Sequence, residues 1–245
     1  MIREALLIPT PAGEIGAVIT RPEGRSRMAA AILEGIGGRR FGVNGLWTRL
    51  ADSLAEAGIT VLRMDYPGRG DSGAAGRRRG TDLFGLETAL GWFRDRTGDL
   101  DFIPIGVCFG ARPAIDAVLR DPRARGLALV NPYLRTVPSP AGLRLRKLVS
   151  RVRGRGLVLP VDRRVVQDLC GASALVPVLA LTGERDAWTR DLSAVRSRCP
   201  ATPNLDVVTI PGIALHKHGT LAAQRATHDH ILRWVVEHLL ESVSR

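Results

Sequence analysis

The chain has 245 residues, a length that one large α/β domain with a single core can fill. Hydrophobic residues make up 45% of it and charged residues 24%, which is typical of a globular protein, and no run of 18 apolar residues offers a membrane span. The first residues lack the charged-then-apolar order of a signal peptide. Three cysteines are too few and too scattered for a disulfide framework or a metal cluster. We therefore predict a cytoplasmic protein with no metal or other cofactor.

The net charge of +11 comes almost entirely from arginine, since Lys147 and Lys217 are the only lysines. A basic cluster without any acid lies between positions 141 and 156 and contains Arg144, Arg146, Lys147, Arg151, Arg153 and Arg155. No nucleic-acid recognition motif accompanies it, and aromatic residues form only 4% of the chain, so a stacking platform is not expected. We expect the basic cluster to attract an anionic substrate or an acidic carrier protein rather than nucleic acid.

Apolar runs and turn signals predict the elements of the first half of the chain. Two short strands around a turn at 11–14 are expected within 4–20. Predominantly apolar runs, which suit central parallel strands, occupy 28–33, 59–64, 102–107 and 126–130. Helical spacing of apolar residues predicts helices over 46–57, 81–96 and 111–120.

The second half begins with a stretch that has no strand signal. Residues 131–175 are rich in proline, hold the basic cluster and are interpreted as an inserted cap, helical over 141–153. Strands at 177–181 and 205–210 and a long helix at 220–240 follow. This alternation predicts an α/β fold over 1–245 as a single domain: a mostly parallel sheet of about eight strands, flanked by helices. In such a sheet the chemistry lies beyond the carboxyl ends of the strands.

The most informative motif is Gly106-Val107-Cys108-Phe109-Gly110, directly after an apolar strand and before a helix. It is the G-x-S-x-G nucleophile elbow with cysteine in place of serine. A strand-to-helix turn of this kind lifts the central side chain above the sheet, where the following helix N-terminus favours a thiolate. The alternative is a buried core cysteine without a chemical role.

A base and an orienting acid are needed to activate such a thiol. All five histidines follow residue 215. Three of them lie in the final helix, so His216 and His218, in the loop before it, are the candidates, with His216 preferred. Asp186 follows a strand by a short turn, in the order nucleophile, acid, histidine. Glu184 is the nearest competing acid, and Asp186 would equally serve as a helix N-cap.

The oxyanion hole requires one N–H after the nucleophile and one from the loop after the third strand. We expect Phe109 to supply the first and Ile36 the second, with Gly35 as the alternative to Ile36. Glu34 adjoins the same loop. It is either an ordinary strand-end residue or a carboxyl group close enough to the sulfur to influence its ionisation.

These features, in this order, resemble the α/β-hydrolase superfamily over nearly the whole chain: a glycine-rich loop, Asp65-x-x-Gly-x-Gly-Asp-Ser72, the elbow, Gly183-x-x-Asp186 and a histidine before the last helix. The cysteine elbow is similar to that of dienelactone hydrolases, whose glutamate near the thiol corresponds to Glu34. The stretch from 37 to 65 also resembles hydrolases found beside exosortase systems. The resemblance implies the α/β-hydrolase fold and a structural turn in which Asp71 and Ser72 hold a loop, so Ser72 is not taken as a nucleophile.

We therefore expect an acyl-transfer enzyme that cleaves an ester, lactone or thioester through an acyl-cysteine, as a hydrolase or thioesterase. Two alternatives stay open: an acyltransferase or cyclase with an acceptor other than water, and a non-catalytic binding module. The expected partner is a small-molecule acyl substrate, either anionic or bound to coenzyme A or a carrier protein. Neither a membrane partner nor any particular oligomeric state is predicted.

Overall fold

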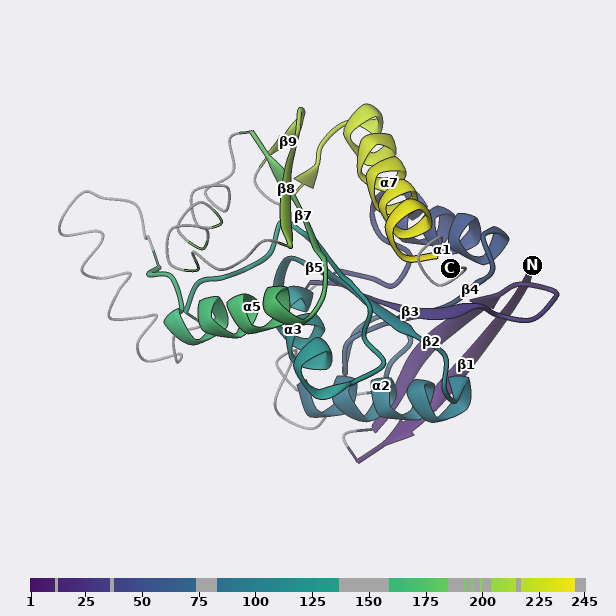
Figure 1. Cartoon of the computed structure of the whole chain (residues 1–245). Coiled ribbons are helices and arrows are strands. Elements are labelled where there is room, and N and C mark those ends of the chain that lie inside the picture. The colour runs from purple at the N-terminus through teal and green to yellow at the C-terminus, as the bar shows by residue number, and fades with distance from the viewer. Residues whose placement is uncertain are drawn as a thin grey trace.

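The computed structural model describes residues 1–11, 13–35, 38–73, 83–136, 159–184, 192, 195, 199, 204–214 and 217–240 (Figure 1). The side chains of residues 83, 84, 214, 217 and 218 are not described. The strands are β1 (Ile2–Thr10), β2 (Gly13–Arg21), β3 (Met28–Leu33), β4 (Ile59–Met64), β5 (Phe102–Val107), β6 (Leu127–Val130), β7 (Val178–Gly183), β8 (Leu205–Ile210), β9 (Ile213–Ala214) and β10 (Lys217–His218). The helices are α1 (Leu46–Glu56), α2 (Leu83–Thr97), α3 (Ala111–Arg120), α5 (Arg163–Leu175) and α7 (Leu221–Val235), with short helical turns at Val43–Gly45, Cys108–Gly110 and Val236–Leu240.

Eight strands form one sheet in the order β1-β2-β4-β3-β5-β6-β7-β8. The pairs β1–β2 and β2–β4 are antiparallel, and every other pair in this sheet is parallel. The chain passes from β3 to β4 on one side and returns to place β5 on the other side of β3. The carboxyl ends of β3 and β5 therefore meet where the strand order reverses, the usual place for a ligand in an open α/β sheet.

The sheet is built from the apolar runs that were predicted to be central strands. Every residue of β3, β4, β5 and β7 is buried, as expected for strands covered on both faces. The edge strands differ: β1 has mostly exposed residues, and in β8 only the first and last residues, Leu205 and Ile210, are buried. The prediction of a mostly parallel sheet of about eight strands flanked by helices is confirmed.

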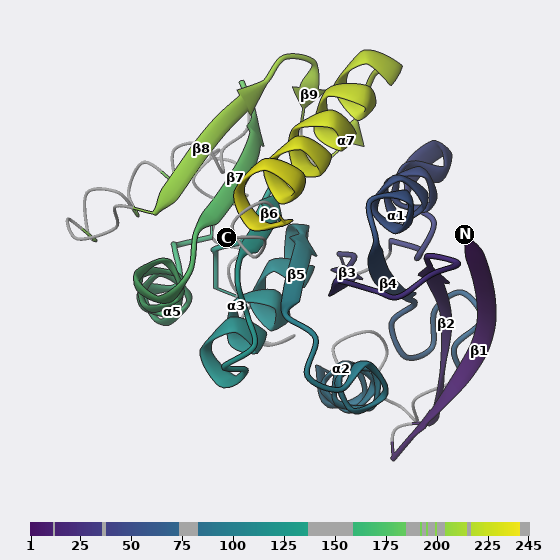
Figure 2. The same cartoon turned by 45° about the vertical axis from the view of Figure 1, so that its right-hand side comes forward.

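Helices cover both faces of the sheet and enclose two cores (Figure 2). On one face α1 and α7 pack on the strands and on each other, and α1 contributes Trp47, Leu50 and Leu54 to that core. On the other face α2, α3 and α5 lie side by side, and the α3 side chains pack between β5 and α5. This arrangement follows from apolar residues that recur at helical spacing along each helix.

Residues 131–175 were interpreted as a cap, and only their two ends lie among the described residues. The ends are paired: Thr136 N donates to Pro160 O at 2.9 Å, Asp162 N donates to Leu134 O at 2.8 Å, and Arg135 bridges to Val161. The helix α5 follows, and it was not predicted; it packs on α3 as an ordinary crossover helix between β6 and β7. The predicted helix at 141–153 and the basic cluster lie outside the described residues, so the cap stays a prediction.

The three cysteines were expected to be too few and too scattered for a disulfide framework, and the structure joins two of them in a single bond. Cys170, in α5, and Cys199 form a disulfide with their Cα atoms 5.8 Å apart, within the usual range for such a bond. They are 29 residues apart in the chain but pack on the same core, and that proximity depends on tertiary structure. Cys108 takes no part in this disulfide.

None of the helices in the described part has the length and apolar character needed to cross a membrane.

The elbow glycines give a test of the packing. A Cβ on Gly110 would lie 1.9 Å from the Leu33 carbonyl oxygen, so Gly110→Ala should destabilise the protein by about 3 kcal/mol or more. Gly91, inside α2, has open space around the position of a Cβ. Gly91→Ala should therefore stabilise the protein by about 1 kcal/mol through helix propensity. Urea unfolding of both variants checks this, and a Gly110→Ala variant as stable as the wild type would contradict the contact.

Candidate active site

Cys108 occupies the strained position that the elbow motif predicts. Its φ is 51°, in the left-handed region that non-glycine residues seldom adopt, and its side chain is partly exposed. The flanking glycines are required by contact. A Cβ on Gly106 would lie 2.6 Å from Ala111 Cα in α3, and one on Gly110 would meet the end of β3. The predicted strand-to-helix turn is thus confirmed, with one 3₁₀ turn before α3.

The elbow touches the loop that follows β3. Leu33 is in register with Gly106, which places the next residues of the β3 loop beside the thiol. Gly35 is in direct contact with it: a Cβ on Gly35 would lie 3.0 Å from Cys108 Cβ and 3.5 Å from its Sγ. The two segments expected to supply oxyanion donors therefore meet at the sulfur.

Phe109 lies directly after the sulfur-bearing residue, where the turn enters α3, and its side chain is almost fully buried. Its ring lies 6.0 Å from the Tyr133 ring, and the guanidinium of Arg112 stacks over both rings at 5.5 and 5.9 Å. Tyr133 N also donates to Cys108 O at 2.9 Å. These contacts fix the backbone around the nucleophile position from the side opposite Gly35.

Glu34 has a carboxyl group that is partly cut off from water. Its Oε2 oxygen is buried and has no hydrogen-bond partner among the described residues, although the residue as a whole is partly accessible. Burial raises the pKa of Glu34 to about 8, and hydrogen bonds from the Trp47 indole and the Gly35 N–H oppose that rise. Gly38, in the same loop, lies directly against this side chain: a Cβ on Gly38 would lie 2.0 Å from Glu34 Cγ. Glu34 is therefore largely protonated at neutral pH.

Tyr66 lies near Glu34 and Cys108, and it was not identified from the sequence as part of the site. It is 1% exposed, and its hydroxyl has no hydrogen-bond partner among the described residues. Burial raises the pKa of Tyr66, and negative charge on Glu34 and on Cys108 raises it further, so all three groups lie within electrostatic reach of one another. The available signal was a tyrosine two residues after the end of the fully buried strand β4, inside the Asp65–Ser72 motif.

Several predicted site residues lie outside the described residues: Ile36, Asp186, His216 and the basic residues Arg144, Arg146, Lys147, Arg151 and Arg153. Their described flanks converge. A Cβ on Gly183, three residues before Asp186, would lie 2.1 Å from Ile213 O. Ile213 pairs with His218 in the β9–β10 hairpin, so His216 lies in the chain between those two strands. The assignment of acid and base therefore stays a prediction.

The expectation that Ser72 is structural is confirmed. Its Oγ donates to Asp65 O at 3.0 Å and accepts from Gly16 N at 2.9 Å, which ties the 65–72 turn to β2.

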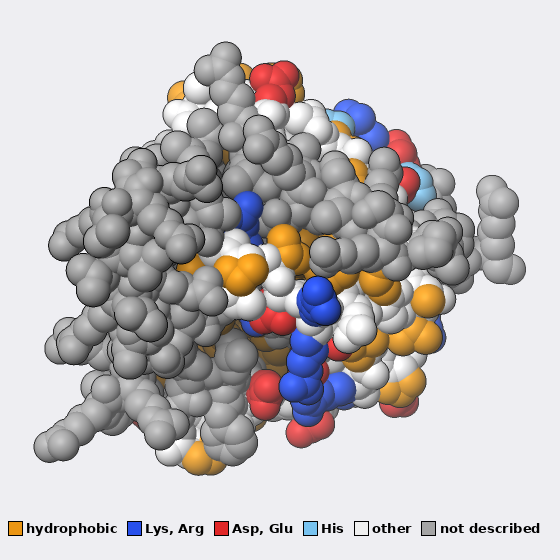
Figure 3. Space-filling view, turned by 90° about the vertical axis from the view of Figure 1, so that its left-hand side faces the viewer, with side chains coloured by type: hydrophobic (Ala, Val, Ile, Leu, Met, Phe, Trp, Pro, Cys, Tyr) orange, Lys and Arg blue, Asp and Glu red, His pale blue; other side chains and the backbone are white. Residues whose placement is uncertain are grey.

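Much of the arginine in the described part of the chain is paired with acids. Ion pairs hold Arg3, Arg40, Arg94, Arg96, Arg112, Arg120, Arg123 and Arg125. In the described part of the face in Figure 3, basic side chains accordingly lie beside acidic ones instead of forming a patch of one sign. No cluster of three or more His, Cys, Asp or Glu suited to a metal ion occurs among the described residues.

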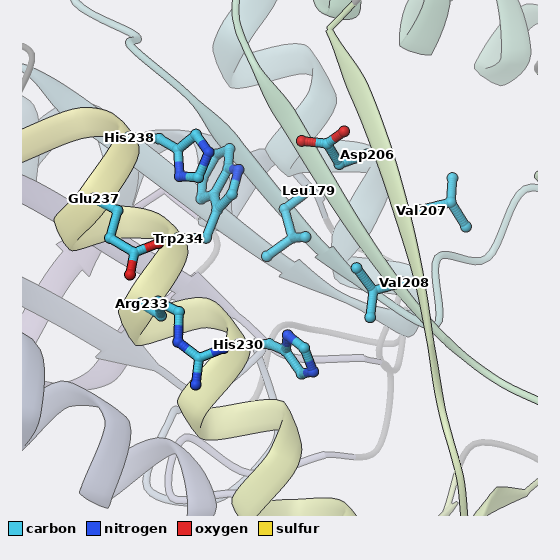
Figure 4. Close-up of a pocket in the computed structure, with 9 residues that line it drawn as sticks. All are labelled: Leu179, Asp206, Val207, Val208, His230, Arg233, Trp234, Glu237 and His238. Atoms are coloured by element: carbon cyan, nitrogen blue, oxygen red, sulfur yellow. The ribbon is translucent and has the colours of Figure 1, made fainter.

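A pocket of about 290 Å³ lies between β8 and α7 (Figure 4). It is lined by the first half of β8, by Leu179 near the start of β7 and by His230, Arg233, Trp234, Glu237 and His238. Because β7 and β8 run parallel to β5, these residues lie toward the amino ends of the strands, whereas Cys108 follows the carboxyl end of β5. The pocket is thus separate from the elbow.

The buried carboxyl group gives a stability test. Glu34 has an ordinary pKa of 4.5 in the unfolded chain and a pKa of about 8 in the folded one. Between these pH values the unfolded chain has lost the Glu34 proton and the folded chain still holds it. The contribution of this proton to the free energy of unfolding is therefore fully present below about pH 4.5 and is lost as the pH rises towards 8. Glu34→Gln should remove this fall, which amounts to roughly 3 to 5 kcal/mol.

Urea unfolding at pH 5 and pH 8 measures the difference. Glu56→Gln, at an exposed glutamate at the end of α1, serves as the control and should keep the wild-type pH dependence. If wild type and Glu34→Gln lose the same stability between pH 5 and 8, the carboxyl is ionised in the folded state.

Comparison with known proteins agrees with this geometry. Residues 32–153 match the family model described as the alpha/beta hydrolase fold, and no curated protein sequence matches the chain. Among solved structures, a carboxyl esterase from Bacillus coagulans is 15% identical, with 96% of this chain and 98% of that chain covered and a TM-score of 0.69. A Klebsiella pneumoniae protein assigned as a dienelactone hydrolase is 18% identical (97% and 99% covered, TM-score 0.66). A thioesterase domain from the curacin biosynthetic pathway is 15% identical (95% and 99% covered, TM-score 0.69). Sheet order, elbow and these similarities together establish that the chain has the α/β-hydrolase fold.

Proposed function

We propose that this protein is an acyl-transfer enzyme that cleaves an ester, lactone or thioester through an acyl-cysteine on Cys108. The observation that carries the proposal is the backbone of Cys108, held at a φ of 51° with Gly35 against its side chain. A strained, partly exposed thiol at the start of a helix is costly to maintain for packing alone. Strain of this kind is usual where a nucleophile must be presented to a substrate.

The reaction proceeds in two halves. His216 takes the thiol proton, and the Cys108 thiolate forms a bond to the carbonyl carbon, whose oxygen becomes an oxyanion held by the N–H groups of Phe109 and Ile36. Collapse of this intermediate breaks the bond to the alcohol or thiol leaving group, which receives the proton from His216. Water, deprotonated by His216, then attacks the acyl-cysteine carbonyl, the C–S bond breaks, and the acid is released while Cys108 takes the proton back from His216. Asp186 orients the imidazole throughout.

Glu34 supports the thiol in this scheme. A thiolate next to an ionised carboxylate would be disfavoured by like charge, whereas the raised pKa of Glu34, caused by burial, keeps that carboxyl neutral at pH 7. The N-terminus of α3 and the free N–H groups there add positive potential under the sulfur.

The first test measures acylation directly. Intact-protein mass spectrometry after incubation with p-nitrophenyl esters and acyl thioesters should show one acyl group added to the wild type and none to Cys108→Ala. His216→Ala and His218→Ala in the same assay identify the base as the variant that loses acylation by 100-fold or more. Rapid loss of the adduct in water indicates a hydrolase, whereas an adduct that persists until an alcohol or amine is added indicates an acyltransferase.

Alkylation supplies an independent control for the thiol. Iodoacetamide should label Cys108 well below pH 8.5, the usual pKa of a free cysteine, because the neighbouring histidine and helix favour the thiolate. Cys170 and Cys199 are joined to each other and should not react. Labelling only above pH 8.5, with no adduct from any ester, would favour a binding module.

We also propose that the basic cluster attracts an anionic acyl group, coenzyme A or an acidic carrier protein. Charge reversal at Arg151 and Arg153 should raise KM for an anionic thioester at least tenfold at low salt, with little effect at high salt, because screening shortens the reach of surface charges. Reversal of Arg21 and Arg25, two exposed arginines at and just after the end of β2, makes the same charge change and should leave KM unaltered. If the wild type and both charge-reversal variants have equal KM values at low salt, the basic cluster does not attract the substrate.

A further inference from the structure

The loop between β3 and α1 carries the predicted oxyanion donor, and one residue fixes its far end. Arg40 uses both its backbone and its side chain: its N–H donates to Asp65 Oδ1 at 2.8 Å, and its guanidinium contacts Asp65 Oδ2 and Asp71 Oδ2. Its carbonyl oxygen accepts from Arg63 Nη1 at 3.2 Å. All of these partners belong to β4 or to the turn that follows it.

The partners of Arg40 are themselves held firmly. The Asp65 side chain is fully buried, and its backbone N donates to Gly16 O in β2 at 2.9 Å. Gly70 lies against the same carboxylate, since a Cβ there would be 2.1 Å from Asp65 Oδ2. Arg63 is buried in β4 and also donates to Thr48 Oγ1, in α1, at 2.7 Å. A buried carboxylate with a guanidinium and two backbone N–H donors strongly disfavours displacement of any member.

The near end of the loop is fixed at the thiol. Gly35 contacts Cys108, and Glu34 is bound by Trp47. Gly38 N donates to Gly35 O at 2.9 Å, which closes a turn around the two residues between them. The two described ends of this loop, at Gly35 and at Arg40, are therefore both held in place.

We propose that Arg40, clamped to Asp65 and Asp71, is a positioning residue for the oxyanion hole of the proposed reaction. This inference rests on the proposed acyl transfer. Arg40 reaches neither the thiol nor the acyl group; it acts by holding the backbone of the loop so that its N–H is aimed at the developing oxyanion. An error of about 1 Å in such a donor costs up to roughly 100-fold in rate.

Comparing the alkylation and acylation rates of Cys108 distinguishes a positioning role in the oxyanion hole from a general effect on the thiol or on folding. Attack on iodoacetamide forms no oxyanion, whereas attack on p-nitrophenyl acetate does. Arg40→Gln should therefore acylate 10- to 100-fold more slowly than the wild type, while its iodoacetamide rate stays within about twofold. Arg40→Lys retains the charge but cannot bind both carboxylates with a planar guanidinium, so its acylation rate should lie between those of the wild type and Arg40→Gln. Arg39→Gln, with the same charge change at the exposed neighbouring position, should match the wild type in both reactions.

The outcomes are distinct. Wild-type acylation by Arg40→Gln would overturn the inference and leave the proposed function intact. An equal fall in both rates would assign Arg40 to general folding and would also overturn the inference. No acylation of the wild type by any ester would overturn the proposed function, and this inference with it.

Discussion

The contact between the elbow after β5 and the end of β3 is the constraint on which the rest of the site depends. Gly110 lies against the Leu33 carbonyl, Gly106 against α3, and Gly35 against Cys108. A side chain at Gly106 or Gly110 would clash with backbone atoms, one at Gly35 would crowd Cys108, and Cys108 between them has a positive φ. Backbone atoms this close cannot be rearranged without moving the two central strands, so the large buried sheet stabilises the strained turn.

Two buried carboxyl groups near this contact are accommodated in different ways. Asp65 has the Arg40 guanidinium and backbone N–H donors, so its charge is matched by a cation and by hydrogen bonds. The described groups that act on Glu34 are neutral donors, an indole and an amide. Desolvation then exceeds their contribution, and the proton stays on Glu34 at neutral pH. One carboxyl group thus holds Arg40 at the end of the loop, and the other, being protonated, places no negative charge next to the thiol.

The sequence predicted the fold well because each central strand is a mostly apolar run and the helices have apolar residues at regular spacing. The predicted strand at 102–107 and the helix at 111–120 have the bounds of β5 and α3. The helix α5 was missed because its stretch was grouped with the proline-rich residues before it. The disulfide was missed because Cys170 and Cys199 are brought together by the packing of elements distant in the chain.

The sequence by itself determined the fold class and the elbow, because these depend on local patterns of apolar period and glycine spacing, whereas the structural role of Ser72 was what the family resemblance implied. Only the tertiary structure decided which charges are buried and what they contact. Glu34, Tyr66 and Cys108 come from three different strand ends, and Arg40 meets Asp65 and Asp71 across a loop. Such proximity, and the desolvation that sets the pKa of Glu34, depends on how β3, β4 and β5 lie next to one another in the sheet, and strand order is not encoded in any one segment.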